Sequence, residues 1–193
     1  MESFEKGFKT DFKPAISAIK VQQIRFTSSL KLNESGEWYR VQDPTKPTYV
    51  GTPSPDIDHA WNTLLTGRYV NLTGTQKADL ESEGVIQEFH HGFYAGPDVF
   101  HSLHCLNALR KVIYKDYYAE EIKSDFGLQS LHIDHCMDQL RQAVQCAGDL
   151  TPVTIVPVYN GTLGLGETER THTCRNFQSL LDWKAELKTA KLP

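Results

Sequence analysis

Long apolar runs are the first feature that this sequence lacks. No stretch approaches the roughly 20 residues that a membrane-spanning helix needs. The start, from Met1 to Phe12, alternates charged and aromatic residues where a secretory signal would need an apolar run. The sequence as it stands therefore predicts a soluble chain.

An excess of basic charge is also missing. The chain has 20 Lys and Arg residues against 24 Asp and Glu residues, and neighbouring basic residues such as Arg110 and Lys111 are typical of a helix surface. A nucleic-acid surface needs a basic stripe, so nucleic acid is a poor candidate for a partner. The composition, with 39% hydrophobic and 23% charged residues, argues against disorder and fits a single domain over residues 1–193.

Cysteine is scarce, and its number allows two disulfides in any of three connectivities, although a domain of this size does not require them. The four cysteines are Cys105, Cys136, Cys146 and Cys174. Three glycosylation sequons matter only if the protein enters a secretory lumen. They begin at Asn33, Asn71 and Asn160.

The pattern along the chain predicts an α+β fold with a mainly helical core and peripheral short strands. Residues 1–55 form an extended N-terminal arm, because 21–32 favours one or two strands and four prolines between 43 and 55 oppose a helix. The remaining elements are helices over 56–67, 75–83, 98–118, 131–147 and 176–188, a loop or hairpin over 89–97, a linker over 124–127, a strand over 153–156 and a flexible loop over 161–166.

The two long helices within 98–147 should each turn an apolar stripe toward the core. Asp98 is expected to cap the first of them. At helical spacing the stripes consist of Leu106, Leu109 and Ile113 on the first helix and Ile133, Met137, Leu140 and Val144 on the second.

A duplicated motif lies in these two helices. His101-Ser-Leu-His104-Cys105 and His132-Ile-Asp-His135-Cys136 coincide at an offset of 31 residues, together with a leucine and an arginine further along. Positions i, i+3 and i+4 share one face of a helix, so each copy presents two imidazoles and a thiol together. Paired ligands on facing helices hold metals in helical-bundle oxidases, which is an analogy of geometry.

The duplication predicts a metal site made by His101, His104, His132 and His135. A single His-x-x-His pair is more often packed in a core than ligated, but two copies with matching neighbours favour ligation over structural or acid-base histidines. Imidazole suits copper, zinc or iron, and the spacing does not choose among these metals.

The cysteines allow two interpretations. They are thiolate ligands, or, in an oxidising lumen, they form the simpler disulfide state. In the second case Cys105 with Cys136 would clamp the two helices, and Cys146 with Cys174 would tie the final segment to the second helix.

The remaining histidines carry weaker signals. His172 completes a coordination shell or caps a turn. His90 and His91 lie in a loop that could fold over the site, although exposed loop histidines are the simpler reading. His59 either packs near Trp61 or faces solvent.

Two arginines and four aromatic residues are further candidates. Arg110 and Arg141 bind a substrate carboxylate or form structural ion pairs. The aromatic residues are equally plausible as pocket walls or as core, and they are Trp61, Phe93, Tyr94 and Phe100.

Several segments together resemble the fungal UstYa-like proteins, which accompany pathways for ribosomal cyclic peptides and other mycotoxins. The doubled His-x-x-His-Cys motif is the most specific part of the resemblance. The matching segments are Phe8-Lys-Thr-Asp11, Pro53 to Trp61, Val99 to Lys111, His132 to Gln142 and His172-Thr-Cys174-Arg175.

The resemblance implies redox chemistry and a preference for copper. Members are associated with oxidative cyclisation, hydroxylation, desaturation and halogenation at unactivated positions, so the expected function is a copper-dependent oxidase that tailors a fungal metabolite or peptide at C–H bonds. The implied partners are a small-molecule or peptide substrate and dioxygen, with a second copy of the chain or a related family member as protein partner. Relatives carry an N-terminal membrane anchor, so the implied location is the secretory-pathway lumen, membrane-anchored if such a segment precedes this sequence.

Two rival functions remain open. In a redox-neutral cyclase or isomerase the same histidines would do acid-base work or position the substrate. In a non-catalytic binding protein they would hold structural zinc.

Overall fold

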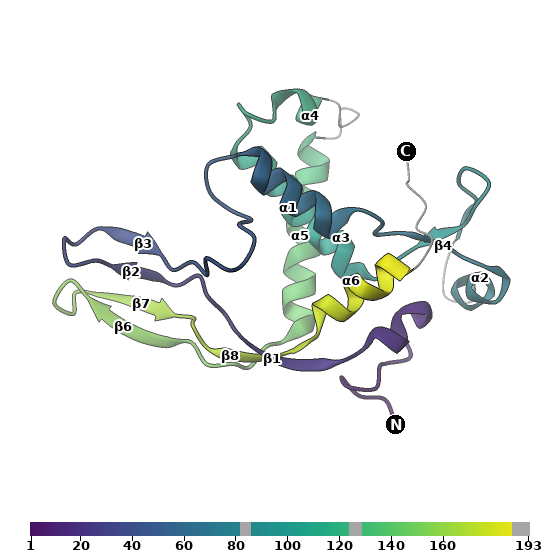
Figure 1. Cartoon of the computed structure of the whole chain (residues 1–193), viewed down its shortest axis with the longest axis horizontal. Coiled ribbons are helices and arrows are strands. Elements are labelled where there is room, and N and C mark those ends of the chain that lie inside the picture. Colours follow the sequence, from purple (N-terminus) through teal and green to yellow (C-terminus); the bar gives the residue numbers. More distant parts are fainter. Residues whose placement is uncertain (82–85, 124–128, 187–193) are drawn as a thin grey trace.

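The computed structural model describes residues 1–81, 86–123 and 129–186. It has a mixed α+β fold that is mainly helical, as predicted, with short strands at the periphery (Figure 1). The helices are α1 (Pro55–Leu65), α2 (Gly74–Glu81), α3 (Asp98–Ile113), α4 (Ala119–Lys123), α5 (Gln129–Ala147) and α6 (Phe177–Glu186), and a 3₁₀ helix, η1, spans Lys13–Ala18.

Four antiparallel strand pairs surround these helices. The pair β1 (Val21–Arg25) with β8 (Thr171–Arg175) connects the N-terminal part of the chain with the C-terminal part. The other pairs are β2 (Leu30–Leu32) with β3 (Trp38–Arg40), β4 (Val70–Asn71) with β5 (Tyr94–Ala95), and β6 (Thr154–Val158) with β7 (Leu163–Glu167).

The hairpins β2–β3 and β6–β7 project from the helical part on one side of the molecule (Figure 1). Their ends touch, because Trp38 donates a hydrogen bond through Nε1 to the Tyr159 hydroxyl at 2.9 Å. Asn33 and Asn160, two of the three sequon asparagines, are exposed at the turns of these hairpins, whereas Asn71 lies in β4 and accepts a hydrogen bond from the Phe93 N–H. Use of the sequons stays a prediction.

The compact core lies where α1 meets α3. Ser54 caps α1 by accepting from the Ile57 N–H, and Pro55 occupies the first turn, where a missing N–H has no consequence. The helix then buries Ile57, Trp61 and Leu65, against which Leu103 of α3 packs. Trp61 and Phe100, two of the predicted pocket walls, are therefore core residues, with 4% and 1% of their surface exposed.

The predicted helices exist, but the predicted end of the first long helix is wrong. The helix α3 ends at Ile113 rather than Tyr118. The N–H groups of Tyr117 and Tyr118 turn back to the Tyr114 carbonyl, and this turn brings the Tyr118 hydroxyl to Arg110. The Tyr118 side chain is only 2% exposed as a result. Asp98 is also not a cap, because it is the first residue of α3, and its carboxylate accepts from Ser102 and Gln139.

The predicted apolar stripes are wrong at four positions. Leu106 and Ile113 on α3 are 46% and 75% exposed, and Met137 and Val144 on α5 are 59% and 72% exposed. The helices α3 and α5 pack on each other instead through the face that carries the motif. On this face Cys105 and Cys136 are fully buried, whereas the histidines are half-buried or, at His135, exposed.

The strands β3, β4, β7 and β8 were not predicted. The segment 161–166, expected to be a flexible loop, contributes most of β7, and His172 lies in β8 rather than at a turn. The strand β6 confirms the prediction for 153–156, and β1 and β2 confirm that for 21–32. The predicted linker over 124–127 and the predicted ends of two helices, at 82–83 and 187–188, lie outside the described residues.

Candidate metal centre

The four motif histidines lie together where α3 crosses α5. The ring centroids of His101 and His135 are 5.2 Å apart, and those of His104 and His132 are 5.6 Å apart. Within each helix the rings are further apart, at 6.3 Å on α3 and 6.5 Å on α5. The closest imidazole pairs therefore span the two helices, which run antiparallel here.

The pair of His101 and His135 has a separation that suits two ligands of one metal ion. Their Nε2 atoms are 3.3 Å apart. With metal–nitrogen distances of about 2.0 to 2.1 Å, two ligands of a tetrahedral ion are separated by about 3.3 to 3.4 Å. The residues present thus fit a metal ion without rearrangement of these two rings.

Cys105 adds a third donor to this pair. Its Sγ is 3.9 Å from His101 Nε2, and the ligand atoms of His101, Cys105 and His135 all lie within 4.8 Å of one another. The Cys105 side chain is fully buried. Two imidazoles and a thiol form a donor set that suits copper or zinc.

The described chain contains no disulfide between its four cysteines. The ring pairs place residue 101 opposite 135 and 104 opposite 132, so the Cα atoms of Cys105 and Cys136 are offset by five residues, about 7.5 Å along the helix axes. This offset exceeds the usual Cα separation across a disulfide, about 4.4 to 6.8 Å. It argues against the pairing of Cys105 with Cys136, and the pairing of Cys146 with Cys174 stays a prediction.

Asp98 lies beside the first histidine. Its Oδ1 lies 3.8 Å from His101 Nδ1, and Gln139 on α5 donates to both Asp98 oxygens, at 3.0 and 3.1 Å. A carboxylate beside the second ring nitrogen fixes which nitrogen of a ligating histidine carries its lone pair. Sequence reasoning missed this proximity because the position of Asp98 suggested a helix cap, although its spacing of three residues from His101 was visible.

His172 does not belong to this centre. It accompanies Asp149, which follows the end of α5, and its Nδ1 is 2.6 Å from Asp149 Oδ2. From His135 to Ala147 the helix alone spans about 18 Å. Hydrogen bonds from Thr151 and then from His172 hold the pKa of Asp149 at about 2, so this carboxylate stays charged and orients the His172 ring. His172 therefore lies too far from His135 to complete the predicted coordination shell.

The other predicted candidates also lie elsewhere. His90 and His91 are exposed in the turn between Phe89 and Gly92, and His59 is exposed on α1. Arg110 is 6% exposed and donates hydrogen bonds to Asn107, Tyr118 and Asp58, a structural network. Arg141 is exposed and pairs with Asp138.

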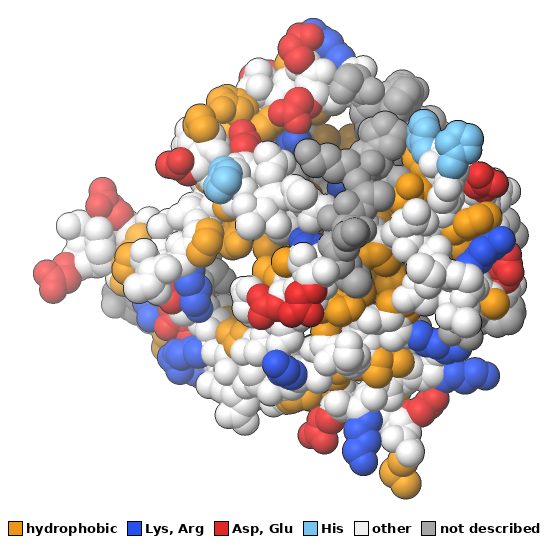
Figure 2. All heavy atoms as spheres, turned by 45° about the vertical axis from the view of Figure 1, so that its right-hand side comes forward, with side chains coloured by type: hydrophobic (Ala, Val, Ile, Leu, Met, Phe, Trp, Pro, Cys, Tyr) orange, Lys and Arg blue, Asp and Glu red, His pale blue; other side chains and the backbone are white. Residues whose placement is uncertain are grey.

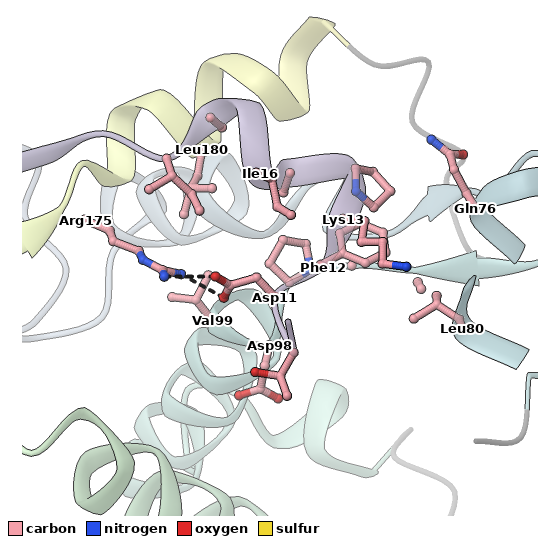
Figure 3. A pocket seen from close by; sticks show the side chains of 18 of the residues that line it. Asp11, Phe12, Lys13, Ile16, Gln76, Leu80, Asp98, Val99, Arg175 and Leu180 are labelled. Carbon is pink, nitrogen blue, oxygen red and sulfur yellow. Dashed lines mark hydrogen bonds and ion pairs between the residues drawn. The ribbon is translucent and has the colours of Figure 1, made fainter. Parts of the chain in front are cut away.

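Two cavities flank the centre. The first, the N-terminal cavity, has a volume of about 510 Å³ and lies between η1, the start of α3 and α6. Arg175 and Asp11 face each other across one side of it, and Asp98 and Val99 lie below them (Figure 3). On the face turned forward in Figure 2, hydrophobic side chains line hollows between acidic and basic groups.

The second cavity, here the α3–α4–α5 cavity, has a volume of about 360 Å³ and includes His104 and His132 in its wall. Its other lining residues include Asn107, Leu109, Val112, Lys115, Ile122 and Ile133. The residues predicted as aromatic pocket walls are not among them. Two of the four histidines thus line this cavity, whereas none of them lines the N-terminal cavity.

The chain is similar to a known protein family over a region that includes both histidine motifs. The sequence model of the family described as mycotoxin biosynthesis protein UstYa matches residues 6–187. A UstYa family oxidase of Diaporthe leptostromiformis, phomYd, is 33% identical over 95% of this chain and 64% of its own length. VicYc, a UstYa family oxidase of Bipolaris victoriae, is 47% identical over 47% of this chain and 86% of its own length.

A third relative has a different name. Transacylase cctO of Talaromyces islandicus is 27% identical over 89% of this chain and 58% of its own length. The chain thus spans less than two thirds of the length of phomYd and of cctO. No solved structure matches it. Among the described residues, no helix combines the length and the apolar character needed to span a bilayer.

The family match covers nearly the whole chain and includes both histidine motifs, and on this evidence the chain belongs to the UstYa family of mycotoxin biosynthesis proteins.

Proposed function

We propose that this protein is a copper-dependent oxidase that modifies a fungal secondary metabolite or peptide at a C–H bond. The single observation that carries the proposal is the pairing of four imidazoles across α3 and α5, with the Nε2 atoms of His101 and His135 3.3 Å apart. The names of the relatives phomYd and VicYc as oxidases support the redox class. Cyclisation, hydroxylation, desaturation and halogenation all remain within this proposal.

The residues divide into those that would hold copper and those that would handle substrate. His101 and His135, with Cys105, form one donor group, and His104 with His132 forms the second pair. Bound copper would supply the one-electron steps that dioxygen chemistry requires. Zinc or iron would fit the same donors, and zinc would lack this redox capacity.

The protein's own groups have three tasks in this reaction. Asp98, held by Gln139, keeps the His101 ring in its orientation. The α3–α4–α5 cavity would place a substrate C–H bond next to His104 and His132. In a cyclisation or desaturation the substrate loses two hydrogen atoms, and dioxygen takes up the two electrons and two protons to become hydrogen peroxide.

The test is the metal content of protein made in a secretory host, measured by elemental analysis. Copper near stoichiometry is expected in the wild type and should be lost from a variant with His101, His104, His132 and His135 all replaced by Ala. The control is His59→Ala with His91→Ala, two exposed histidines outside the centre. A second variant, His101→Ala with His135→Ala, covers the case in which the fourfold change unfolds the chain. Failure to bind copper after reconstitution would refute the proposal.

A redox-neutral function is the second candidate, and the relative named as a transacylase favours it. Cys105, His101 and Asp98 form a chain of thiol, imidazole and carboxylate, with separations of 3.9 and 3.8 Å, an order found in acyl-transfer enzymes. Full burial of Cys105 argues against attack by its sulfur on a bound substrate. Product formation by metal-free protein without oxygen, lost in Cys105→Ser, would favour this candidate over the oxidase. The open cavity beside the histidines argues against a purely structural zinc site.

A further inference from the structure

One face of α5 carries apolar side chains that the described part of the chain leaves partly or largely exposed. Met137 and Val144 are 59% and 72% exposed, and Ile133 and Leu140 are half-buried. These four residues, here the α5 stripe, follow one another at intervals of four, three and four residues, which is the spacing in the seam of a coiled coil. Among the described elements, α5 makes its extensive contact with α3 alone. The stripe therefore has the pattern of a helix interface without a second helix on it.

The α5 stripe is separate from the face of α5 that meets α3. The ring of His132 lies against that of His104, and Gln139 donates to Asp98, so these side chains mark the face turned toward α3. At 3.6 residues per turn, the stripe lies about a third of a turn further around the helix. A second helix can thus pack on the stripe without displacing α3.

We propose that two copies of this chain form a symmetric dimer in which their α5 helices pack antiparallel through the α5 stripe. Asp134 and Arg141 flank the stripe on one side, because they are seven residues apart. In an antiparallel pair with the two stripes in contact, Asp134 of each copy comes next to the partner's Arg141. The two ion pairs are equivalent by symmetry, so this edge of the stripe is complementary in charge to itself.

A parallel pair of α5 helices lacks this complementarity. Arg141 would then face the partner's Cys136, which is uncharged and buried. In the single chain Arg141 pairs with Asp138 at 2.7 Å, and both side chains are more than half exposed. Exposed pairs contribute little to stability, so Arg141 can exchange this partner for the exposed Asp134 of a second copy at little cost.

The dimer also adds a wall to the α3–α4–α5 cavity. In the antiparallel arrangement Ile133 packs level with the partner's Val144, and Met137 packs level with the partner's Leu140. Ile133 lines the cavity together with Leu109 and Val112. The end of the partner's α5 therefore lies beside this edge of the cavity and extends its apolar surface.

The length of the stripe sets the expected affinity. From Ile133 to Val144 it spans about 17 Å, which places the interface at the low end of specific interfaces, below about 1,200 Å² in total. The dimer should accordingly dissociate with a Kd on the order of 10 µM.

The test is sedimentation velocity of metal-free protein from about 1 to 100 µM, a range around the expected Kd. A reductant is present, so that a disulfide through the exposed Cys146 cannot join two chains. Val144→Glu places a charge in the seam and should leave a monomer over this range. The matched control is Leu131→Glu, which changes a leucine that is 67% exposed on the side of α5 away from the stripe, and it should leave the dimer intact.

Charge reversal tests the antiparallel arrangement. Asp134→Arg and Arg141→Asp each place like charges next to one another twice in the dimer, so each should weaken it about tenfold. The double variant restores two opposite pairs and should bring the affinity back to within about threefold of the wild type. A wild type that stays monomeric, as expected if a different protein covers the stripe, would overturn the inference. A dimer that survives Val144→Glu, or a double variant as weak as the single ones, would do the same.

A second measurement needs no variant. Met1 and Met137 are the two methionines of the chain, and Met1 is fully exposed outside the stripe. Peroxide should oxidise Met137 more slowly as the protein concentration rises through the Kd, while Met1 keeps a constant rate, and unchanged rates for both would contradict the dimer. These experiments use no copper, so a dimer that takes up no copper would refute the oxidase alone, and a copper-binding monomer would refute the dimer alone.

Discussion

The buried network around Arg110 permits a sharp prediction for stability. Arg110 donates to Asp58 at 2.9 Å and to the Tyr118 hydroxyl at 2.7 Å, and that hydroxyl donates to Asp58 at 2.5 Å. Desolvation, followed by the bond to Asp58, raises the pKa of Tyr118, so the phenol stays a donor. Asp58→Ala leaves a guanidinium that is 6% exposed without its carboxylate. Loss of one partner of a buried pair costs about 3–5 kcal/mol.

The lower end of that range applies here because the Asp58 side chain is 28% exposed and water can replace it in part. A loss of about 3 kcal/mol corresponds to a fall in Tm of about 6–12 °C for a chain of this length. The assay is urea unfolding followed by circular dichroism, with calorimetry for Tm.

The matched control is Asp138→Ala, which breaks the exposed pair with Arg141 and should cost less than about 1 kcal/mol. In an Arg110→Met background the penalty for Asp58→Ala should shrink, since no buried charge is left unpaired. Equal losses for Asp58→Ala and Asp138→Ala would refute the reasoning.

Three more predictions concern the centre and its surroundings. Asp98→Asn should weaken metal binding about tenfold or more in a chelator competition, because the carboxylate that orients His101 loses its charge; unchanged affinity would remove Asp98 from this role. His172→Ala should leave the metal content unchanged, and a loss of metal would contradict its placement on β8. The hydrogen bond from Arg175 lowers the pKa of Asp11. This pair therefore stabilises the fold above about pH 4, and its contribution falls as the pH drops through the lowered pKa. Arg175→Met should make the urea midpoint depend less on pH between about pH 5 and pH 2, and an unchanged pH dependence would argue against this role.

The sequence predicts the two motif helices well because the helical pattern of apolar residues extends over many residues and most of these residues favour helix. It does not predict which face is buried. Hydrophobicity places Leu106 and Met137 inward, yet both are exposed, because α3 and α5 meet through the face that carries the buried cysteines and the half-buried His101, His104 and His132. Hydrophobic periodicity alone does not identify such a contact.

The strand β7 was missed because glycine is rare in strands and Gly164 and Gly166 suggested a flexible loop. The structure gives these glycines a packing reason. A Cβ on Gly164 would lie 2.7 Å from Ile155 Cγ2 on the opposing strand, so the close approach of β6 and β7 needs a residue without a side chain. Such contacts depend on register, which a single sequence does not reveal.

The sequence predicts that the four motif histidines lie together, but it does not predict how they pair. Spacing along each helix indicates that His101 and His104 share a face. Only the antiparallel register shows that each of them meets a partner from α5. The bond from Gln139 to Asp98 and the cavity wall join residues that are far apart in the chain, so a single sequence does not reveal them.

The repeated motif, folded back on itself, gives the centre an approximate twofold axis that its surroundings break. Rotation about this axis exchanges His101 with His132 and His135 with His104. Asp98, which accepts from Gln139, lies beside the first pair, whereas the second pair lines the α3–α4–α5 cavity. Two sets of ligands that are alike in sequence therefore have different surroundings, and metal ions bound to them would differ in potential and in access to the cavity. Equivalent substitutions in the two copies, such as His101→Ala and His132→Ala, should for this reason have unequal consequences.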